Sequence, residues 1–334
     1  MTPLAISLNA ILVIAGMVLL YGGGGGLVKG ASGIALHLSI SPLVIGLTVV
    51  AFGTSAPELF VSVLSAIQGK MGVSLGNVLG SNVINIALIL GIAAVARPME
   101  VNQAVIRFDG PFMLVTYALV ALGMVNFGGG PVWLGGTILR WEGLVLATVL
   151  VVYVILLHRR SNRPGTTPPA VVAGPAEADA ARPLWLDGTF VVVGIAFLAV
   201  GAEILVRGAS TLATEVFGAS ERFVGIAIVA FGTSLPELFT TIAGITRGEM
   251  DISVGNIVGS NIFNSLMVLG MTALIRPIQV GQTDFRSDFA FMVGVTVLLL
   301  LFLLARKKVP RWGGVLFLGI YGVYFVFLMA TRTV

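Results

Sequence analysis

Long apolar stretches constrain this chain of 334 residues more than any other feature of its sequence. Several exceed the roughly 20 residues that an α-helix needs to cross a bilayer. Only 10% of the residues are charged and 57% are hydrophobic, whereas a soluble domain carries about 25% charged residues. The sequence therefore predicts an all-α polytopic membrane protein. Ten transmembrane helices are expected, at about 4–37, 42–68, 72–95, 108–126, 138–157, 187–216, 222–246, 251–274, 286–305 and 312–331.

The ten predicted helices fall into two copies of one sequence. Residues 44–98 align without gaps with residues 223–277, and 25 of these 55 positions are identical, which indicates a duplication. Each copy holds five helices, and because five is odd the second copy must enter the membrane in the opposite orientation. Such inverted repeats are typical of secondary transporters, whose substrate site lies near the membrane midplane. The expected division is a first five-helix repeat at 1–157, a linker at 158–186 and a second, inverted five-helix repeat at 187–334.

The distribution of basic residues predicts the orientation in the membrane. With the N-terminus outside, the inner loops hold 11 Lys and Arg residues, and the outer loops and ends hold six. Because cytoplasmic loops are enriched in Lys and Arg, we expect a cytoplasmic linker and both termini outside a cell inner (plasma) membrane. The net charge of +4 has the same explanation and requires no nucleic-acid partner. The N-terminal residues lack a basic region and a cleavage site, so we expect them to begin the first helix.

One ten-residue motif places polar groups inside this apolar context, and it occurs twice. AFGTSAPELF covers residues 51–60, and AFGTSLPELF covers residues 230–239. Proline lacks an N–H, so Pro57 and Pro236 should each kink or break the helix. Helical spacing places four residues of each copy on one face. These are Ala51, Thr54, Ser55 and Glu58 in the first copy, and Ala230, Thr233, Ser234 and Glu237 in the second.

The two glutamates predict a functional site. A carboxylate at the centre of a membrane helix costs about 3 kcal/mol or more, so it should lie within the protein or line a water-filled cavity. Helix kinks and hydroxyl bonds to the backbone explain Pro, Gly, Ser and Thr partly, but they do not explain Glu58 and Glu237. Oxygen ligands without His or Cys suit hard cations such as Na⁺ and Ca²⁺.

A second motif follows each copy of the first. GNVLGSNVIN at residues 76–85 spaces Asn77, Ser81 and Asn85 four residues apart, and GNIVGSNIFN at residues 255–264 repeats the spacing. The second set consists of Asn256, Ser260 and Asn264. These residues are candidate ligands or interhelical hydrogen-bond donors. The hydrogen-bonding role is strongest for Asn82 and Asn261, which fall off the shared face.

Charge counting favours an exchanger. Two ionised glutamates give a site a charge of −2, which one Ca²⁺ or two Na⁺ would balance, and two cargoes competing for the same carboxylates is what exchange requires. From the residues alone, protons could replace Na⁺ in this scheme.

GTSxPE followed by GNxxGSN, once in each half, resembles the α-repeats of the cation/Ca²⁺ exchanger superfamily, specifically its sodium/calcium exchanger branch. The resemblance covers essentially the whole chain. It implies alternating access, in which the long first and sixth helices slide past a comparatively fixed core. It also implies a central site where Glu58 and Glu237 ligate Ca²⁺ and share in Na⁺ binding. The further implied ligands are the side chains of Thr54, Ser55, Ser81, Asn85, Thr233, Ser234 and Ser260 and the backbone carbonyls of Ala51 and Ala230.

The chain differs from some relatives at informative positions. Potassium-dependent members carry Asp where this chain has Asn264, which argues against potassium dependence. Proton-coupled members carry Glu in the second motif where this chain has Gly80 and Gly259, which makes proton coupling less favoured. We expect no cofactor and no obligate protein partner, and Ca²⁺ and Na⁺ are the expected substrates.

Three alternatives remain open from the sequence. A Ca²⁺/H⁺ antiporter would use the same glutamates as proton carriers. A cation channel is compatible with a duplicated chain. An intramembrane hydrolase would use Ser55 or Ser234 as nucleophile, but the two histidines, His37 and His158, lie near predicted helix ends, so a general base is not evident.

Overall fold

The computed structural model describes residues 3–38, 40–125, 136–161, 182–215, 230–280 and 285–331. Eight described helices are long and apolar enough to span a membrane, or nine if the bent pair Pro42–Thr54 and Ala56–Ile67 forms one span. The protein is therefore a multi-pass membrane protein. The predicted helix at 222–246 is described only from residue 230, and most of the predicted linker at 158–186 lies outside the described residues. The total of ten helices thus stays a prediction.

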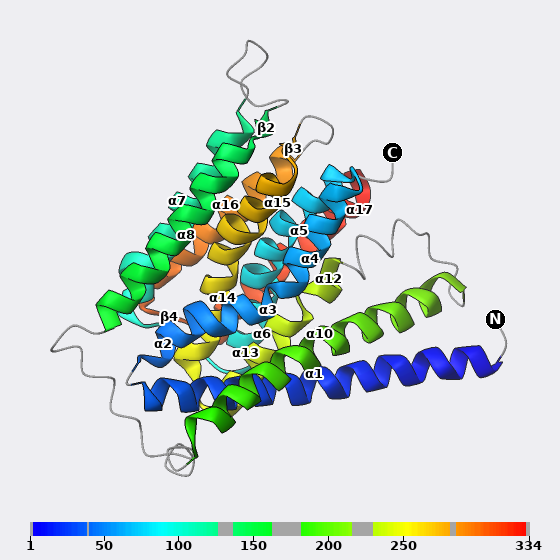
Figure 1. Ribbon diagram of the computed structural model, residues 1–334, viewed down its shortest axis with the longest axis horizontal. Coiled ribbons are helices and arrows are strands. Elements are labelled where there is room, and N and C mark those ends of the chain that lie inside the picture. The colour runs from blue at the N-terminus through cyan, green and yellow to red at the C-terminus, as the bar shows by residue number, and fades with distance from the viewer. Residues whose placement is uncertain are drawn as a thin grey trace. The chain divides into compact units, whose positions relative to one another are not determined.

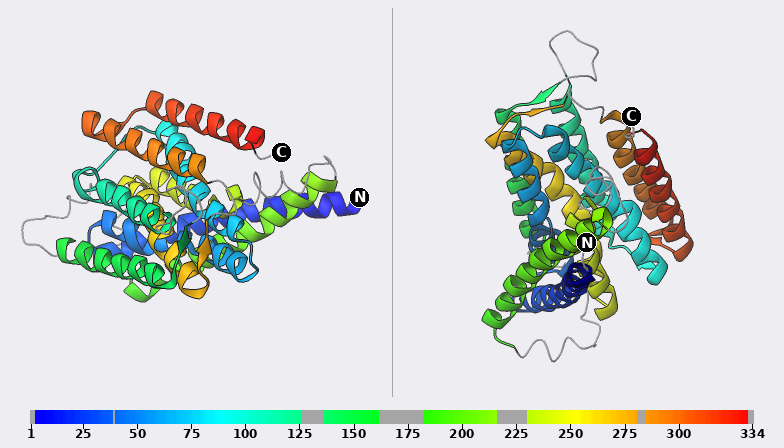
Figure 2. Two further views of the ribbon diagram at one scale, coloured as in Figure 1. Left: turned by 90° about the horizontal axis from the view of Figure 1, so that it is seen from above. Right: turned by 90° about the vertical axis from the view of Figure 1, so that its right-hand side faces the viewer.

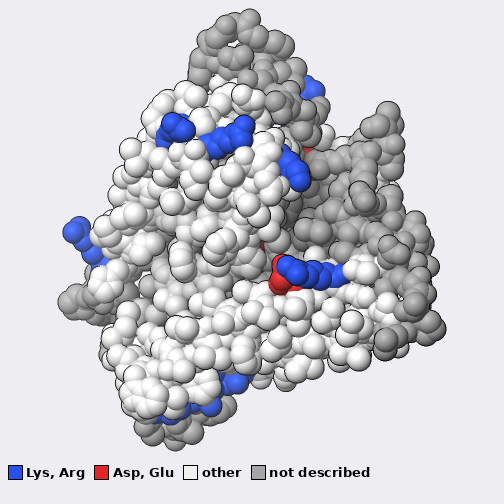
Figure 3. All heavy atoms as spheres, turned by 45° about the vertical axis from the view of Figure 1, so that its right-hand side comes forward, with Lys and Arg blue, Asp and Glu red and all other residues white. Residues whose placement is uncertain are grey.

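The surface fits this conclusion. Acidic and basic side chains are few on the face that Figure 3 shows. Helix α1 (Pro3–His37) exposes large apolar side chains between Ile6 and Tyr21, and Ile11, Ile14 and Val18 are 59%, 62% and 65% exposed. Such a surface is expected where lipid, instead of water, covers the helix.

The described residues form two compact units, and each unit draws on both halves of the chain. The first unit takes Met1–Pro57 and Ser161–Asn256, and the second takes Glu58–Arg160 and Ile257–Val334. The first unit contains α1, α2 (Pro42–Ile45), the π-helix η1 (Gly46–Val50), α3 (Ala51–Thr54), α10 (Leu184–Glu215), α12 (Ala230–Thr233), α13 (Leu235–Arg247) and the first half of α14 (Met250–Phe263). The second contains α4 (Ala56–Ile67) from Glu58 onward, α5 (Met71–Val83), η2 (Ile84–Ile89), α6 (Leu90–Ala96), β1 (Met99–Glu100), η3 (Val105–Asp109), α7 (Gly110–Met124), β2 (Thr137–Ile138), α8 (Arg140–Ser161), the end of α14, η5 (Asn264–Val268), α15 (Leu269–Ile275), β3 (Ile278–Gln279), α16 (Arg286–Arg306), β4 (Lys308–Val309) and α17 (Arg311–Thr331).

In the first unit, α1 and α10 lie side by side along most of their length (Figure 1). Glycines set the spacing of the two helices. A Cβ added at Gly23 would lie 2.9 Å from the carbonyl oxygen of Gly194, and one at Gly201 would lie 3.0 Å from that of Gly16. The main chains therefore touch, as small residues allow in membrane helices. The pairing of Gly16 with Gly201 and of Gly23 with Gly194 makes the two helices antiparallel.

The glycine run at residues 22–26 of α1 serves more than one contact. Gly23 faces α10, whereas a Cβ added at Gly24 would lie 2.9 Å from the backbone of Phe239 in α13. A Cβ at Gly22 would meet nothing within 4 Å. The run therefore lets one helix approach two neighbouring main chains at successive positions.

In the second unit, helices of the two halves also meet at glycines. A Cβ added at Gly314 of α17 would lie 2.7 Å from the carbonyl oxygen of Gly91 in α6, and one at Gly143 of α8 would lie 2.7 Å from that of Gly270 in α15. Figure 2 shows α16 and α17 side by side in both of its views. Aromatic rings such as those of Phe302 and Trp312, with centroids 4.9 Å apart, pack between these two helices.

Two short antiparallel strand pairs complete the second unit. Strand β1 pairs with β4, with Met99 opposite Val309, and β2 pairs with β3, with Ile138 opposite Ile278. Each pair joins a segment of the first half to a segment of the second half. In both, one strand directly follows an apolar helix and the other directly precedes one.

Candidate functional site

Each copy of the ten-residue motif breaks its helix at the serine. Helix α3 ends before Ser55 and α4 begins after it, with a bend of 43° at the break. Helix α12 ends before Ser234, and α13 begins at the next residue. Both serines have ψ of 3°, where an α-helix has about −42°. The predicted breaks are present, and Pro57 and Pro236 lie directly after them in the first turn of the following helix, where the missing N–H costs little.

The breaks place both glutamates in first turns of helices. Glu58 is in the first turn of α4 and Glu237 is in that of α13, and both side chains are 0% exposed. The N-terminus of a helix carries partial positive charge, which favours a carboxylate there. Glu58 and Glu237 belong to different units, so the prediction that they share one site stays a prediction.

In the first unit, residues of the first motif contact residues of the second half. The Ser55 hydroxyl donates to Oε1 of Glu237 at 3.4 Å. The Thr54 hydroxyl donates to Oδ1 of Asn256 at 3.0 Å. The structure thus brings Ser55 and Glu237 together, as expected of residues that act on one ion, although no ligand role follows from the contact itself.

The remaining predicted residues of the two motifs are also buried where they are described. Thr233 and Ser234 are 7% and 1% exposed. The carbonyl oxygen of Ala51 accepts the backbone N–H of Ser55 at 3.0 Å and also lies 3.4 Å from the Thr54 hydroxyl. Ala230 is the first residue of α12.

Two repeat-related asparagines hold the glutamate-bearing helices to the helices that follow them. In the second unit, Nδ2 of Asn77 donates to the carbonyl oxygen of Glu58 at 3.3 Å and to Ser62 Oγ at 3.0 Å. In the first unit, Nδ2 of Asn256 donates to the carbonyl oxygen of Glu237 at 3.4 Å. These amides brace the backbone beside each carboxylate, which is the interhelical role that the sequence left open for them.

The second unit holds polar atoms that are buried and have no hydrogen-bond partner among the described residues. They include Oγ of Ser81, both Oδ1 and Nδ2 of Asn85, and Oδ1 of Asn264. Ser81, Asn85, Ser260 and Asn264 are all at most 1% exposed. Buried polar atoms in proteins are nearly always satisfied, so oxygens of this kind are suited to binding a cation or a water molecule.

π-helices occur where two of these amides lie. Asn264 is the first residue of η5, and Asn85 is the second residue of η2. π-helical turns are rare and are frequent at functional sites. The predicted spacing requires a regular α-helix through residues 76–85 and 255–264, and the π-turns begin at Ile84 and Asn264, near the ends of these segments.

The donors suit a hard cation better than a transition metal. Carboxylate, hydroxyl and amide oxygens are the ligands that Na⁺ and Ca²⁺ prefer. Within the described ranges, no group of three His, Cys, Asp or Glu side chains comes together. The candidate residues therefore offer few charges and many neutral oxygens.

Comparison with known proteins decides the family. The sequence model for sodium/calcium exchanger proteins matches residues 8–158 and 188–330. The chain belongs to the sodium/calcium exchanger family. The resemblance that GTSxPE and GNxxGSN carry is thereby confirmed.

Two relatives of this exchanger are similar to it over almost the whole length of both chains. Inner membrane protein YrbG of Escherichia coli is 37% identical over 95% of each chain. Sodium/calcium exchanger MaX1 of Methanosarcina acetivorans is 30% identical over 97% of this chain and 99% of its own. A solved structure of the sodium-calcium exchanger NCX_Mj has 28% identity and a TM-score of 0.79, and it covers 98% of this chain and 99% of that chain.

The exchanger also buries three aspartates that sequence reasoning missed. In the second unit, Asp109 accepts from the Tyr153 hydroxyl at 3.1 Å, and Asp288 accepts from the Tyr324 hydroxyl at 2.8 Å. Asp109 and Asp288 occupy equivalent positions of the two repeats, 179 residues apart. Extending the repeat alignment at the same offset beyond residues 44–98 and 223–277 pairs Asp109 with Asp288 and would have revealed both. They join the fourth helix of each predicted repeat to the fifth.

The third aspartate lies in the first unit of the exchanger. Asp187, in the first turn of α10, is 0% exposed and forms an ion pair with Arg182 at 3.0 Å. Nε2 of His37 lies 3.4 Å from its other oxygen. This cluster ties the end of α1 to the start of α10, and its partnered charges give it a structural role.

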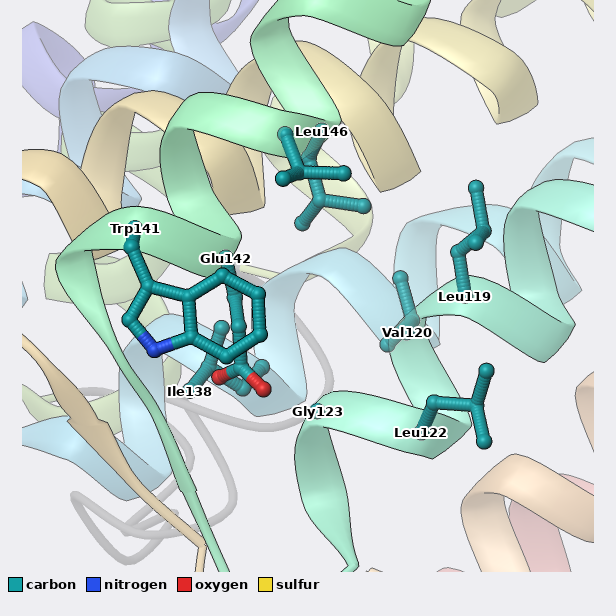
Figure 4. Close-up of a pocket in the computed structure, with 9 residues that line it drawn as sticks. Leu119, Val120, Leu122, Gly123, Ile138, Trp141, Glu142 and Leu146 are labelled. Atoms are coloured by element: carbon teal, nitrogen blue, oxygen red, sulfur yellow. The ribbon is translucent and has the colours of Figure 1, made fainter.

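A pocket of about 150 Å³ lies between α7 and α8 of the exchanger (Figure 4). Its walls are apolar side chains such as Leu122 and Leu146, together with Trp141 and Glu142. The Glu142 carboxylate accepts the backbone N–H of Leu139 at 2.7 Å, so it stabilises the start of α8. No predicted ion ligand lines this pocket, and it is not part of the candidate ion site.

Proposed function

We propose that this chain is a secondary active antiporter that exchanges Na⁺ for Ca²⁺ across a membrane by alternating access. The observation that carries the proposal is the burial of one carboxylate, 0% exposed, directly after each of two repeat-related helix breaks in an apolar membrane protein. Membership of the sodium/calcium exchanger family supports it. The chain is a transporter and not an enzyme.

The ions bind to buried oxygen atoms. Glu58 and Glu237 supply the charge, and their combined charge of −2 balances one Ca²⁺ or two Na⁺. Neutral oxygens complete the coordination and allow the same residues to accept either ion. The proposed further ligands are Thr54, Ser55, Ser81, Asn85, Thr233, Ser234, Ser260 and Asn264 through their side chains, and Ala51 and Ala230 through their carbonyls.

We also propose the complete membrane topology. The chain forms ten transmembrane helices in two inverted five-helix repeats in the inner (plasma) membrane, with the linker in the cytoplasm and both termini outside. Repeat-related helix breaks at Ser55 and Ser234 and repeat-related π-turns at Asn85 and Asn264 support the duplication. The inner-membrane name of the E. coli relative is consistent with the compartment.

The test is uptake of radiolabelled Ca²⁺ into proteoliposomes loaded with Na⁺ and diluted into Na⁺-free medium without a pH gradient. Uptake should require internal Na⁺, should vanish in choline-loaded vesicles and should collapse with a sodium ionophore. Glu58→Gln and Glu237→Gln should abolish it, whereas Glu100→Gln, at an exposed position of β1, should not.

Uptake that ignores Na⁺ but follows an imposed pH gradient would refute sodium coupling and assign the chain to Ca²⁺/H⁺ antiport. Uptake that persists in the Glu58→Gln or Glu237→Gln variant would refute the carboxylate model.

A further inference from the structure

Hydrogen bonds connect five buried residues of the second unit in one chain. The Ser265 hydroxyl donates to the carbonyl oxygen of Asn261 at 2.9 Å. Nδ2 of Asn82 donates to Ser265 Oγ at 3.2 Å and to Sδ of Met292 at 3.5 Å. Nδ2 of Asn264 donates to Oδ1 of Asn82 at 3.2 Å. All five residues are at most 2% exposed.

The direction of each bond in this chain follows from chemistry. A backbone carbonyl can only accept, so the single hydroxyl proton of Ser265 is used toward Asn261. Ser265 Oγ can then only accept from Asn82, and a thioether sulfur such as that of Met292 also only accepts. The amide nitrogen of Asn82 must therefore face both groups, and its oxygen must face Asn264.

This arrangement determines the orientation of Asn264. Because the oxygen of Asn82 accepts, Asn264 must present its amide nitrogen to it. The oxygen of Asn264 then points away from Asn82, and it has no hydrogen-bond partner among the described residues. A buried carbonyl-type oxygen without a partner is a suitable ligand for a cation.

The equivalent residue of the first half lacks such an arrangement. Asn85 occupies the position equivalent to Asn264, and Ile86 occupies that of Ser265, so the hydroxyl is missing. Within the described residues, both polar atoms of the Asn85 side chain have no hydrogen-bond partner. The two repeats therefore differ: one amide is oriented by its neighbours and the other is not.

We infer that Asn82 and Ser265 are positioning residues that fix the oxygen of Asn264 as an ion ligand. The inference rests on the proposed function, in which Asn264 binds a transported ion. Without these two residues the amide of Asn264 can turn over and present its N–H groups, which repel a cation. The second repeat has Ser265 where the first repeat has Ile86, so the amide of Asn264 is oriented and that of Asn85 is not.

The first experiment measures Na⁺-driven Ca²⁺ uptake for Ser265→Ala and Asn82→Ala in proteoliposomes. Each variant should raise the apparent KM for Ca²⁺ or Na⁺ by about threefold to tenfold, the factor that the loss of one buried hydrogen bond implies. The maximal rate should change less, because saturating ion restores the orientation. The matched control is Thr272→Val, since Thr272 is fully buried two turns further along and its hydroxyl has no partner among the described residues.

The second experiment repeats Ser265→Ala in an Asn264→Asp background. An aspartate has an oxygen at both positions and needs no orientation, so the effect of Ser265→Ala on KM should fall below twofold or reverse. A purely structural role of Ser265 would give the same loss in both backgrounds. If the Asn264→Asp variant does not transport ions, binding of radiolabelled Ca²⁺ to the purified protein provides the same comparison.

The possible failures are distinguishable. If the wild-type protein shows no Na⁺-dependent Ca²⁺ uptake, the proposed function fails. If the wild-type protein exchanges the ions but Ser265→Ala leaves both KM values unchanged, the positioning role is overturned. Ser265→Ala decides this point even if Asn82→Ala does not fold, because it removes one oxygen atom and adds no bulk.

Discussion

Neighbouring glycines of α1 should respond in opposite ways to the same substitution. Gly23→Ala places a Cβ 2.9 Å from the carbonyl oxygen of Gly194 and 2.9 Å from the backbone nitrogen of Leu198. Gly22→Ala places one where nothing lies within 4 Å. Both changes replace Gly by Ala inside one helix, so the gain in helix propensity, about 1 kcal/mol, is common to them. Their difference in stability therefore measures the contact between the helices.

The size of that difference follows from the distances. Ordinary contacts begin near 3.4 Å, so α1 and α10 would have to separate by roughly 0.5 Å. Backbone atoms cannot rotate aside, and overpacking of this kind costs about 1–3 kcal/mol. We expect Gly22→Ala to stabilise the protein by about 1 kcal/mol and Gly23→Ala to destabilise it by about 1 kcal/mol.

Thermal denaturation of the purified protein in detergent, followed by the fluorescence of its four Trp residues, would measure the difference. The two variants differ in stability by about 2 kcal/mol. Because the denaturation midpoint shifts by about 2 °C per kcal/mol, their midpoints should differ by about 4 °C when both are heated at the same rate. Equal midpoints for Gly22→Ala and Gly23→Ala would refute main-chain contact between α1 and α10. A stabilised Gly23→Ala variant would refute it more strongly.

Three further predictions concern the buried polar groups. Glu58→Gln and Glu237→Gln should each reduce Ca²⁺ uptake below detection, because one charge next to a divalent ion contributes several kcal/mol at an effective dielectric constant of about 20; measurable uptake by either would contradict the role. Tyr324→Phe should lower stability by about 1–3 kcal/mol through loss of its bond to Asp288, and an unchanged denaturation midpoint would count against that bond. Asn264→Asp should make uptake sensitive to external pH or K⁺ because it adds an ionisable ligand, and an unchanged dependence on both would contradict the expectation.

The sequence was sufficient to predict the helix breaks and the carboxylates. Proline chemistry alone places a break near Ser55 and Ser234, and no lipid-facing helix would carry Glu58 and Glu237. The long helices were also predictable, since hydropathy determines where a chain can cross a membrane. These features depend on local chemistry, which a single sequence records directly.

Other features depend on tertiary contacts and could not be predicted. Nothing in the segment around Asn85 distinguishes a π-turn from an α-turn, because the two differ by one residue in hydrogen-bond spacing. Asp109 accepts a hydrogen bond from Tyr153, 44 residues away, and no sequence pattern connects the two residues. The orientation of Asn264 needs Asn82 and Ser265 together, which only the packing of η5 on α5 reveals.

The two strand pairs have a consequence for the origin of the fold. Strand β3 is the repeat equivalent of β1, at the offset of 179. In both pairs, β1–β4 and β2–β3, a strand of the first half bonds to a strand of the second half. One half of the chain by itself would leave both of its strands with open edges. A single-repeat ancestor could therefore close these ladders only by associating with a second copy of itself, in a two-fold symmetric dimer. Gene fusion would then have converted an intermolecular contact into an intramolecular one, and the two copies could afterwards diverge at positions such as Ile86 and Ser265.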